Sequence, residues 1–132
     1  MSIALWRKRP EAISISEYME RELPESEIKG KCELTDPVTV TLVDSSNLVL
    51  YARVARYQGG YYSGTIYATP TGGALCGVYK RGTPNSKVEA LKQVIRREMD
   101  NCYVTNHSGN MAKLEAALKK ISLLNNVQLT LF

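Results

Sequence analysis

The sequence predicts an α+β domain in which a four-stranded antiparallel meander is covered by two C-terminal helices. Two observations predict this fold class. Residues 38–80 are rich in β-branched and aromatic residues and are divided by turn sequences, which is typical of consecutive strands. After residue 85 the apolar residues recur at the 3.6-residue period of an amphipathic helix. With 132 residues, 44% of them hydrophobic, the chain has the size and composition of one globular domain.

Residues 1–31 form an N-terminal segment in which we expect one short helix, at residues 14–22. Ser14 and Glu17 have the spacing of a capping box, because a serine at the N-cap accepts a hydrogen bond from the backbone three residues later. The charged stretch 21–31 is interrupted by Pro24 and Gly30. We predict that this stretch is a connector that delivers the chain to the next element.

Four strands are predicted next, at residues 38–43, 48–54, 61–69 and 74–80. The sequences between them are short and rich in Gly, Asn, Asp, Ser and Pro, which favour turns. Such turns join antiparallel neighbours, because a parallel pair needs a crossover of about a dozen residues. The expected sheet is therefore a meander.

Two helices follow the strands. Ser86 is the expected N-cap of the first helix, which runs to about Asn101. Its predicted core face is the arc formed by Val88, Leu91, Val94, Ile95, Met99 and Cys102. Residues 106–110 break the pattern. The second helix has the apolar stripe Met111, Leu114, Leu118 and Ile121, and we expect it to end at Asn125 and Asn126.

The residue types that catalysis or metal binding requires are scarce. The one histidine, His107, lies in the loop between the predicted helices. Cys32, Cys76 and Cys102 lack the close pairing of a zinc site, so we interpret them as buried small apolar residues that form no disulfide. The glycines lack the spacing of phosphate-binding loops. We therefore expect no catalytic residue, no metal site, no cofactor and no enzymatic activity.

The sequence also bears on location. No apolar run reaches the roughly 18 residues that a membrane span needs. The apolar stretch at residues 2–6 precedes the basic residues 7–9, which is the reverse of the order in a secretory signal. We expect a cytoplasmic protein with no membrane partner.

Basic residues are interleaved with aromatic ones in a chain of net charge +4. The candidate nucleic-acid-binding residues are Arg53 and Arg56 on the second strand and Lys92, Arg96 and Arg97 on the first long helix. Cations follow phosphates and rings stack on bases, so this pattern suits a surface for DNA or RNA. The alternative is that the cations only solubilise the helix and that tyrosine occurs here because it favours strands.

The sequence ends in Gln-Leu-Thr-Leu-Phe, residues 128–132. This pentapeptide resembles the clamp-binding motif of bacterial DNA replication and repair proteins, Gln-Leu-x-Leu-Phe, at all four defining positions. The motif occurs in lesion-bypass polymerases, mismatch-repair factors and the regulator of replication initiation. The resemblance implies that Gln128, Leu129, Leu131 and Phe132 bind the sliding clamp of the bacterial DNA polymerase. Residues 127–132 would then be a docking tail on a domain at 32–126.

This resemblance implies a non-enzymatic accessory or inhibitor protein, of bacterial, phage or plasmid origin, that acts in DNA replication or repair. Two alternatives stay open: a nucleic-acid-binding module with a basic, tyrosine-rich surface, and an adaptor or inhibitor of another protein machine. For the tail, the alternative to an extended docking peptide is a final edge strand, since apolar and polar residues alternate from 127 to 131.

Overall fold

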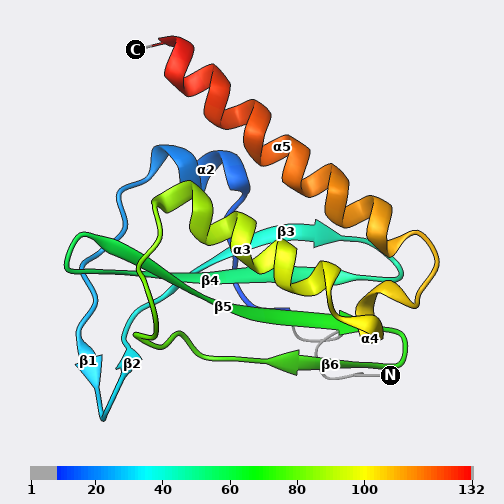
Figure 1. Ribbon diagram of the computed structural model, residues 1–132, viewed down its shortest axis with the longest axis horizontal. Helices are drawn as coiled ribbons and strands as arrows, with labels where there is room; N and C mark the ends of the chain where they lie inside the picture. The colour runs from blue at the N-terminus through cyan, green and yellow to red at the C-terminus, as the bar shows by residue number, and fades with distance from the viewer. Residues whose placement is uncertain (1–8, 132) are drawn as a thin grey trace.

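The computed structural model describes residues 9–131, with side chains as far as Asn126 (Figure 1). The predicted α+β fold is confirmed. A four-stranded antiparallel sheet has the order β3-β4-β5-β6, so each strand pairs with the next along the chain. Its strands are β3 (Val38–Asp44), β4 (Val49–Tyr57), β5 (Gly60–Thr69) and β6 (Gly72–Leu75). Helices α3 (Lys87–Met99), α4 (Cys102–Thr105) and α5 (Asn110–Leu131) follow the sheet.

The fourth strand is shorter than the sequence predicted. β6 ends at Leu75, and the prediction of a strand to residue 80 is wrong. After β6 the backbone finds another partner: the Val78 carbonyl accepts from the Leu34 N–H at 2.9 Å, and the Lys80 N–H donates to the Cys32 carbonyl at 2.7 Å. The chain therefore leaves β5 and passes to the N-terminal part of the molecule.

The N-terminal segment holds both a confirmed and a missed element. Helix α2 (Ile15–Glu20) begins where predicted, and the Ser14 hydroxyl accepts from the Glu17 N–H at 3.1 Å. The connector at 21–31 ends in an element that the sequence did not predict, because β1 (Ile28–Lys29) pairs with β2 (Glu33–Leu34) in a small hairpin. Each strand has two residues, too few to show an alternating pattern.

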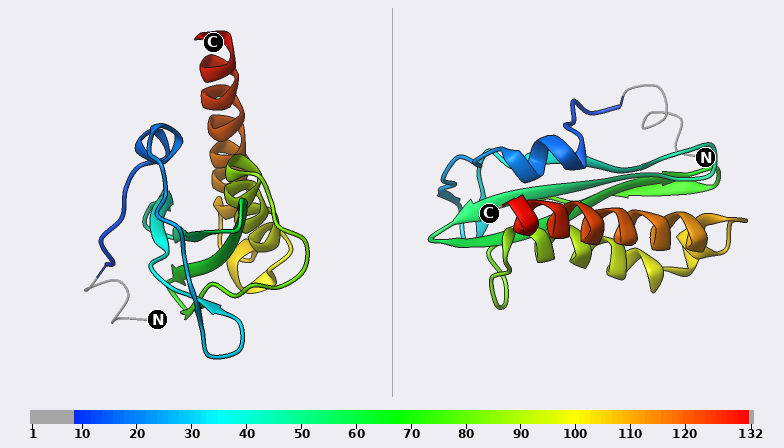
Figure 2. Two further views of the ribbon diagram at one scale, coloured as in Figure 1. Left: turned by 90° about the vertical axis from the view of Figure 1, so that its left-hand side faces the viewer. Right: turned by 90° about the horizontal axis from the view of Figure 1, so that it is seen from above.

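The main core lies between the sheet and the helices. β4 contributes Leu50, Ala52 and Val54, which pack with Leu91, Val94 and Ile95 of α3 and with Leu114, Ala117 and Ile121 of α5. The helices therefore cover one face of the sheet, as predicted, and the side view in Figure 2 shows α3 and α5 along that face. The Ser86 hydroxyl accepts from the Glu89 N–H at 3.1 Å, which confirms the predicted N-cap of α3.

Helix α3 is joined at its start to α2 by reciprocal contacts. The Tyr18 hydroxyl donates to the Lys87 carbonyl at 2.7 Å. In return, the Lys87 amine donates to the carbonyls of Met19 and Arg21 at the C-terminal end of α2, where a cation is favoured. Burial lowers the pKa of Lys87 and raises that of Tyr18 well above its usual range. These contacts fix the position of α3 over the sheet.

Three predicted core positions, Cys76, Cys102 and Met111, lie at the surface instead, and a fourth, Cys32, is half-buried. Cys102 was placed on the core arc of the first helix, but α3 ends at Met99 and Asn101 caps a new helix, α4, which leaves Cys102 exposed. Cys76 is exposed and Cys32 is half-buried, so the interpretation of the cysteines as buried residues is wrong. Met111 is 38% exposed because it lies in the first turn of α5, beside the loop.

The last helix is longer than predicted. Asn125 and Asn126 do not end α5, whose backbone stays helical to Leu131. The edge-strand alternative for residues 127–131 is therefore wrong. Figures 1 and 2 show that the C-terminal turns of α5 extend beyond the rest of the described chain.

The start of α5 is held by a buried side chain. Asn110 is fully buried, and its amide donates to the carbonyls of Val104 at 2.9 Å and Asn47 at 3.0 Å. One residue thus joins α5 to α4 and to the turn between β3 and β4. This attachment fixes the position of the start of α5.

Candidate functional site

The five cations predicted to bind nucleic acid do not form one surface. Arg56, on β4, makes ion pairs with Glu22 at 3.2 Å and Glu25 at 3.4 Å. It holds the segment after α2 against the sheet. Arg53 is half-buried and lines a shallow hollow that also contains the acidic residues Glu33 and Asp36. Both β4 cations therefore lie among carboxylates.

Two of the three α3 cations are also paired. The Arg96 guanidinium lies 3.0 Å from the Glu89 carboxylate, and the Lys92 amine lies 3.9 Å from it. Glu89 is in the first turn of α3, where a negative charge also favours the helix. A phosphate that approached this face would meet one acidic and two basic groups.

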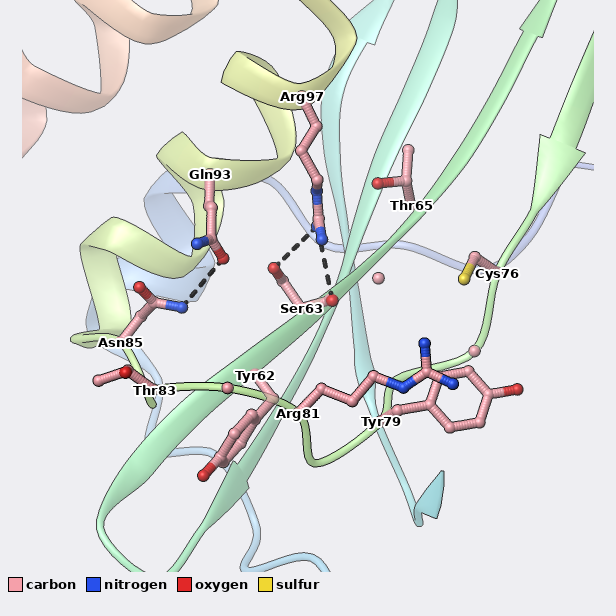
Figure 3. Close-up of a pocket in the computed structure, with 13 residues that line it drawn as sticks. Tyr62, Ser63, Thr65, Cys76, Tyr79, Arg81, Thr83, Asn85, Gln93 and Arg97 are labelled. Atoms are coloured by element: carbon pink, nitrogen blue, oxygen red, sulfur yellow. Dashed lines mark hydrogen bonds between the residues drawn. The ribbon is translucent and has the colours of Figure 1, made fainter. Parts of the chain in front are cut away.

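Arg97 has a different environment. Its guanidinium reaches down from α3 to β5 and donates to the Ser63 hydroxyl at 3.0 Å and, more weakly, to the Ser63 carbonyl at 3.5 Å (Figure 3). Both partners are neutral. The neighbouring carboxylate, Glu98, is 6% exposed and accepts from the Asn101 amide at 3.1 Å. Burial raises the pKa of Glu98 despite the nearby Arg97 charge.

Arg97 lines a hollow that we call the α3–β5 cleft. Its volume is about 470 Å³, and α3, β5 and the loop at residues 76–85 enclose it. A second arginine, Arg81, lies over the Tyr79 ring at 5.0 Å from the ring centre. Figure 3 shows both arginines in the cleft, one from the helix and one from the loop. None of the described residues that line it is acidic.

The loop at residues 76–85 lies close against β5 because glycines allow it. A Cβ atom on Gly64 would lie 2.5 Å from the Gly77 carbonyl oxygen, and one on Gly60 would lie 2.2 Å from Pro84. The loop ends are held by backbone hydrogen bonds: Tyr61 and Asn85 exchange two at 3.0 Å. The loop that forms one wall of the cleft is therefore held firmly against β5.

A second hollow, which we call the Tyr103 hollow, lies further along β5. Its volume is about 260 Å³, and its lining residues are Tyr67, Thr69, Thr71, Gly72, Gly73 and Tyr103. Tyr103, from α4, is 74% exposed. The His107 ring nitrogen Nε2 lies 2.9 Å from the Thr71 hydroxyl at the edge of this region, so the histidine serves to join the α4–α5 loop to the β5–β6 turn.

The described residues give no sign of a metal site, since no three His, Cys, Asp or Glu among them lie close enough to hold an ion. None of the described helices is long and apolar enough to cross a membrane. Comparison with known proteins found nothing similar: no family model, curated protein or solved structure matches this chain.

The C-terminal motif is described only in part. The backbone of Gln128, Leu129 and Leu131 belongs to the last turns of α5. The side chains of these residues, and Phe132 as a whole, lie outside the described residues.

The sequence prediction missed Tyr103. Tyr79 and Arg81 belong to the predicted basic and aromatic surface but were not among the five candidate cations. Tyr79 and Arg81 flank one lysine at the end of the predicted fourth strand, a weak sign of a basic and aromatic edge. Tyr103 carried no such sign, because it lies between the predicted end of the first helix, at about Asn101, and the helix break at residues 106–110. Of the five predicted cations, Arg97 alone lines the α3–β5 cleft with Tyr79 and Arg81.

Proposed function

We propose that this protein docks on the sliding clamp of the bacterial DNA polymerase through residues 128–132. The observation that carries the proposal is the match of Gln128, Leu129, Leu131 and Phe132 to all four positions of the clamp-binding motif. In this function the protein is a non-enzymatic accessory or inhibitor factor of DNA replication or repair. The globular domain either brings a second activity to the clamp or blocks other proteins from it.

The geometry of α5 supports this proposal. Leu124 is the last of the described α5 side chains that packs against the main core, whereas Leu123 is 56% exposed. At 1.5 Å per residue, the helix from Leu124 to Leu131 carries the chain about 10 Å further. Figure 2 shows this end of α5 standing clear of the sheet. A clamp could therefore approach the motif without meeting the domain.

Binding as an extended peptide requires that the last turn of α5 unwinds. Helix ends unwind at the least cost, because their final carbonyls have no partner within the helix. The glutamine amide would then meet polar groups at the mouth of a groove, while the leucines and the phenylalanine fill apolar pockets. Because few residues become ordered, an affinity near 1 μM, about −8 kcal/mol, is expected.

The test is a titration of the full-length chain with a purified bacterial sliding clamp. The double variant Leu131→Ala/Phe132→Ala should abolish binding, because each buried apolar anchor of this size contributes about 2 kcal/mol. Leu123→Ala is the matched control, since it removes an exposed leucine of α5 outside the motif. The control should bind like the parent.

Unfolding by denaturant on the same variants completes the test. If the motif residues serve docking and not packing, the double variant should unfold at the same denaturant concentration as the parent. A parent that does not bind the clamp, or a double variant that binds as tightly as the parent, would contradict the proposal.

A further inference from the structure

The α3–β5 cleft and the Tyr103 hollow lie one after the other along the same strand. Ser63 and Thr65 line the cleft, and Tyr67 and Thr69 line the hollow. These four residues alternate along β5, so their side chains point to the same face. At about 3.4 Å per residue, the stretch from 63 to 69 spans about 20 Å. We call the two hollows together the β5 groove.

The groove is positively charged at one end. Arg97 and Arg81 line the cleft, and none of the described residues that line either hollow is acidic. Arg97 bonds to the neutral Ser63, and Arg81 lies against the neutral Tyr79 ring. Neither arginine makes an ion pair within 4.0 Å among the described residues. Their charges are therefore available to an anion.

The groove is aromatic at the other end. The Tyr103 side chain is 74% exposed, beside the half-buried Tyr67. A ring that protrudes from the short helix α4 contributes little to the core. Stacking on a nucleic-acid base would bury its apolar face, and such stacking tolerates any base.

We propose that the β5 groove binds single-stranded nucleic acid, with a phosphate between Arg97 and Arg81 and a base stacked on Tyr103. The 20 Å length favours a strand over one nucleotide, because only a strand reaches both ends. The hydroxyls of Ser63 and Thr65 can donate to sugar or phosphate oxygens, which gives binding without sequence preference. This site is separate from the C-terminal motif and does not depend on clamp docking.

Fluorescence anisotropy with a labelled, mixed-sequence single-stranded DNA of about fifteen nucleotides tests the proposal on the full-length chain. Arg97→Gln and Arg81→Gln should each weaken binding at least about five-fold. Each should also lower the slope of log affinity against log salt by about 0.7, the contribution of one phosphate contact on a single strand. Arg96→Gln is the matched control, because it removes the neighbouring cation that is paired with Glu89. It should weaken binding by no more than about two-fold, through the loss of long-range attraction, and should leave the slope unchanged.

Tyr103→Ala distinguishes a strand from a smaller ligand. It should weaken the oligonucleotide about five-fold or more, because one stacked base is lost. AMP should bind the parent far more weakly than the oligonucleotide does, because it is too short to reach both ends of the groove. Thermal unfolding of each variant checks that it is folded. If Arg97→Gln alone fails to fold, Arg81→Gln, an exposed loop substitution, carries the same test.

Three results would overturn the proposal. One is a parent protein that does not bind the oligonucleotide at low salt. Another is an equal loss in Arg96→Gln and Arg97→Gln, which would mean diffuse attraction to the whole helix. The third is an unchanged affinity in Tyr103→Ala together with displacement of the strand by equimolar AMP, which would mean a site for mononucleotides.

Discussion

Two sets of cations on this protein differ in what surrounds them. Arg56, Lys92 and Arg96 each lie within 4.0 Å of a glutamate, whereas Arg81 and Arg97, in the α3–β5 cleft, contact a ring and a serine. The first set holds elements together and adds little field at the surface. The second set leaves its charge exposed in a hollow. The net charge of +4 therefore indicates less about anion binding than the positions of those cations that have no carboxylate beside them.

The largest expected difference between the paired cations and the cleft arginines is in the free energy of unfolding. Arg56→Ala should lower the free energy of unfolding by about 1–2 kcal/mol, because it leaves Glu22 and Glu25 without their cation and removes apolar packing by the arginine stem. Arg97→Ala should change it by less than about 0.5 kcal/mol, as expected for an exposed residue. Urea unfolding at pH 7 measures both. Equal losses would mean that the two arginines have the same structural role.

The second prediction tests whether the Glu98 carboxylate neutralises the charge of Arg97, as Glu89 does for Arg96. Burial raises the pKa of Glu98, so as the pH rises the unfolded chain loses this proton first and the folded state becomes less stable. Glu98→Gln cannot ionise. It should be more stable than the parent at pH 7 and equal to it below about pH 4, where the carboxyl is protonated in both states.

Urea unfolding of the parent and Glu98→Gln from about pH 3 to about pH 8 checks this prediction. Asn101 can still donate to the glutamine oxygen, so the hydrogen bond at this position is kept. A variant that is less stable than the parent at pH 7 would show that the Glu98 charge is needed, as in an ion pair with Arg97.

The smallest expected effect is on DNA affinity, when the cations Lys92 and Arg96 lose their carboxylate partner. Glu89→Gln removes the carboxylate that lies beside Lys92 and Arg96. Affinity for single-stranded DNA at low salt should then rise about two-fold through long-range attraction. Stability should fall by a few tenths of a kcal/mol, because α3 loses an acidic residue in its first turn. Anisotropy titration measures the first quantity, and a lower affinity in the variant would contradict it.

The main strands and helices of this protein could be predicted because their signals are local. The box at Ser14 and Glu17, the cap at Ser86 and the turns between strands act over three or four residues, and all appear in the structure. The hairpin of β1 and β2 could not be predicted, because two-residue strands have no periodicity and are stabilised by pairing with residues 76–80.

For the candidate sites, the sequence identified Arg97 and the C-terminal motif, but not the groove. The reason is that Arg97 becomes distinct from Arg96 through residues far away in the chain. Ser63 receives its hydrogen bond, and Gly64 lets the loop that carries Arg81 approach β5. One helical step of about 100° separates the two arginines, and it directs one toward Glu89 and the other toward the sheet.

By itself, then, the sequence determined the α+β class, the meander, the caps and most of the core faces of the helices, since these depend on periodicity and short-range hydrogen bonds. Only the tertiary structure decided which cations are neutralised by carboxylates. It also decided that β6 ends at Leu75 and that α5 continues to Leu131. Those outcomes depend on contacts between distant segments, such as Asn110 with Asn47 and Arg56 with Glu22. Periodicity and local motifs in the sequence do not indicate such contacts, because these contacts form only when distant elements pack together.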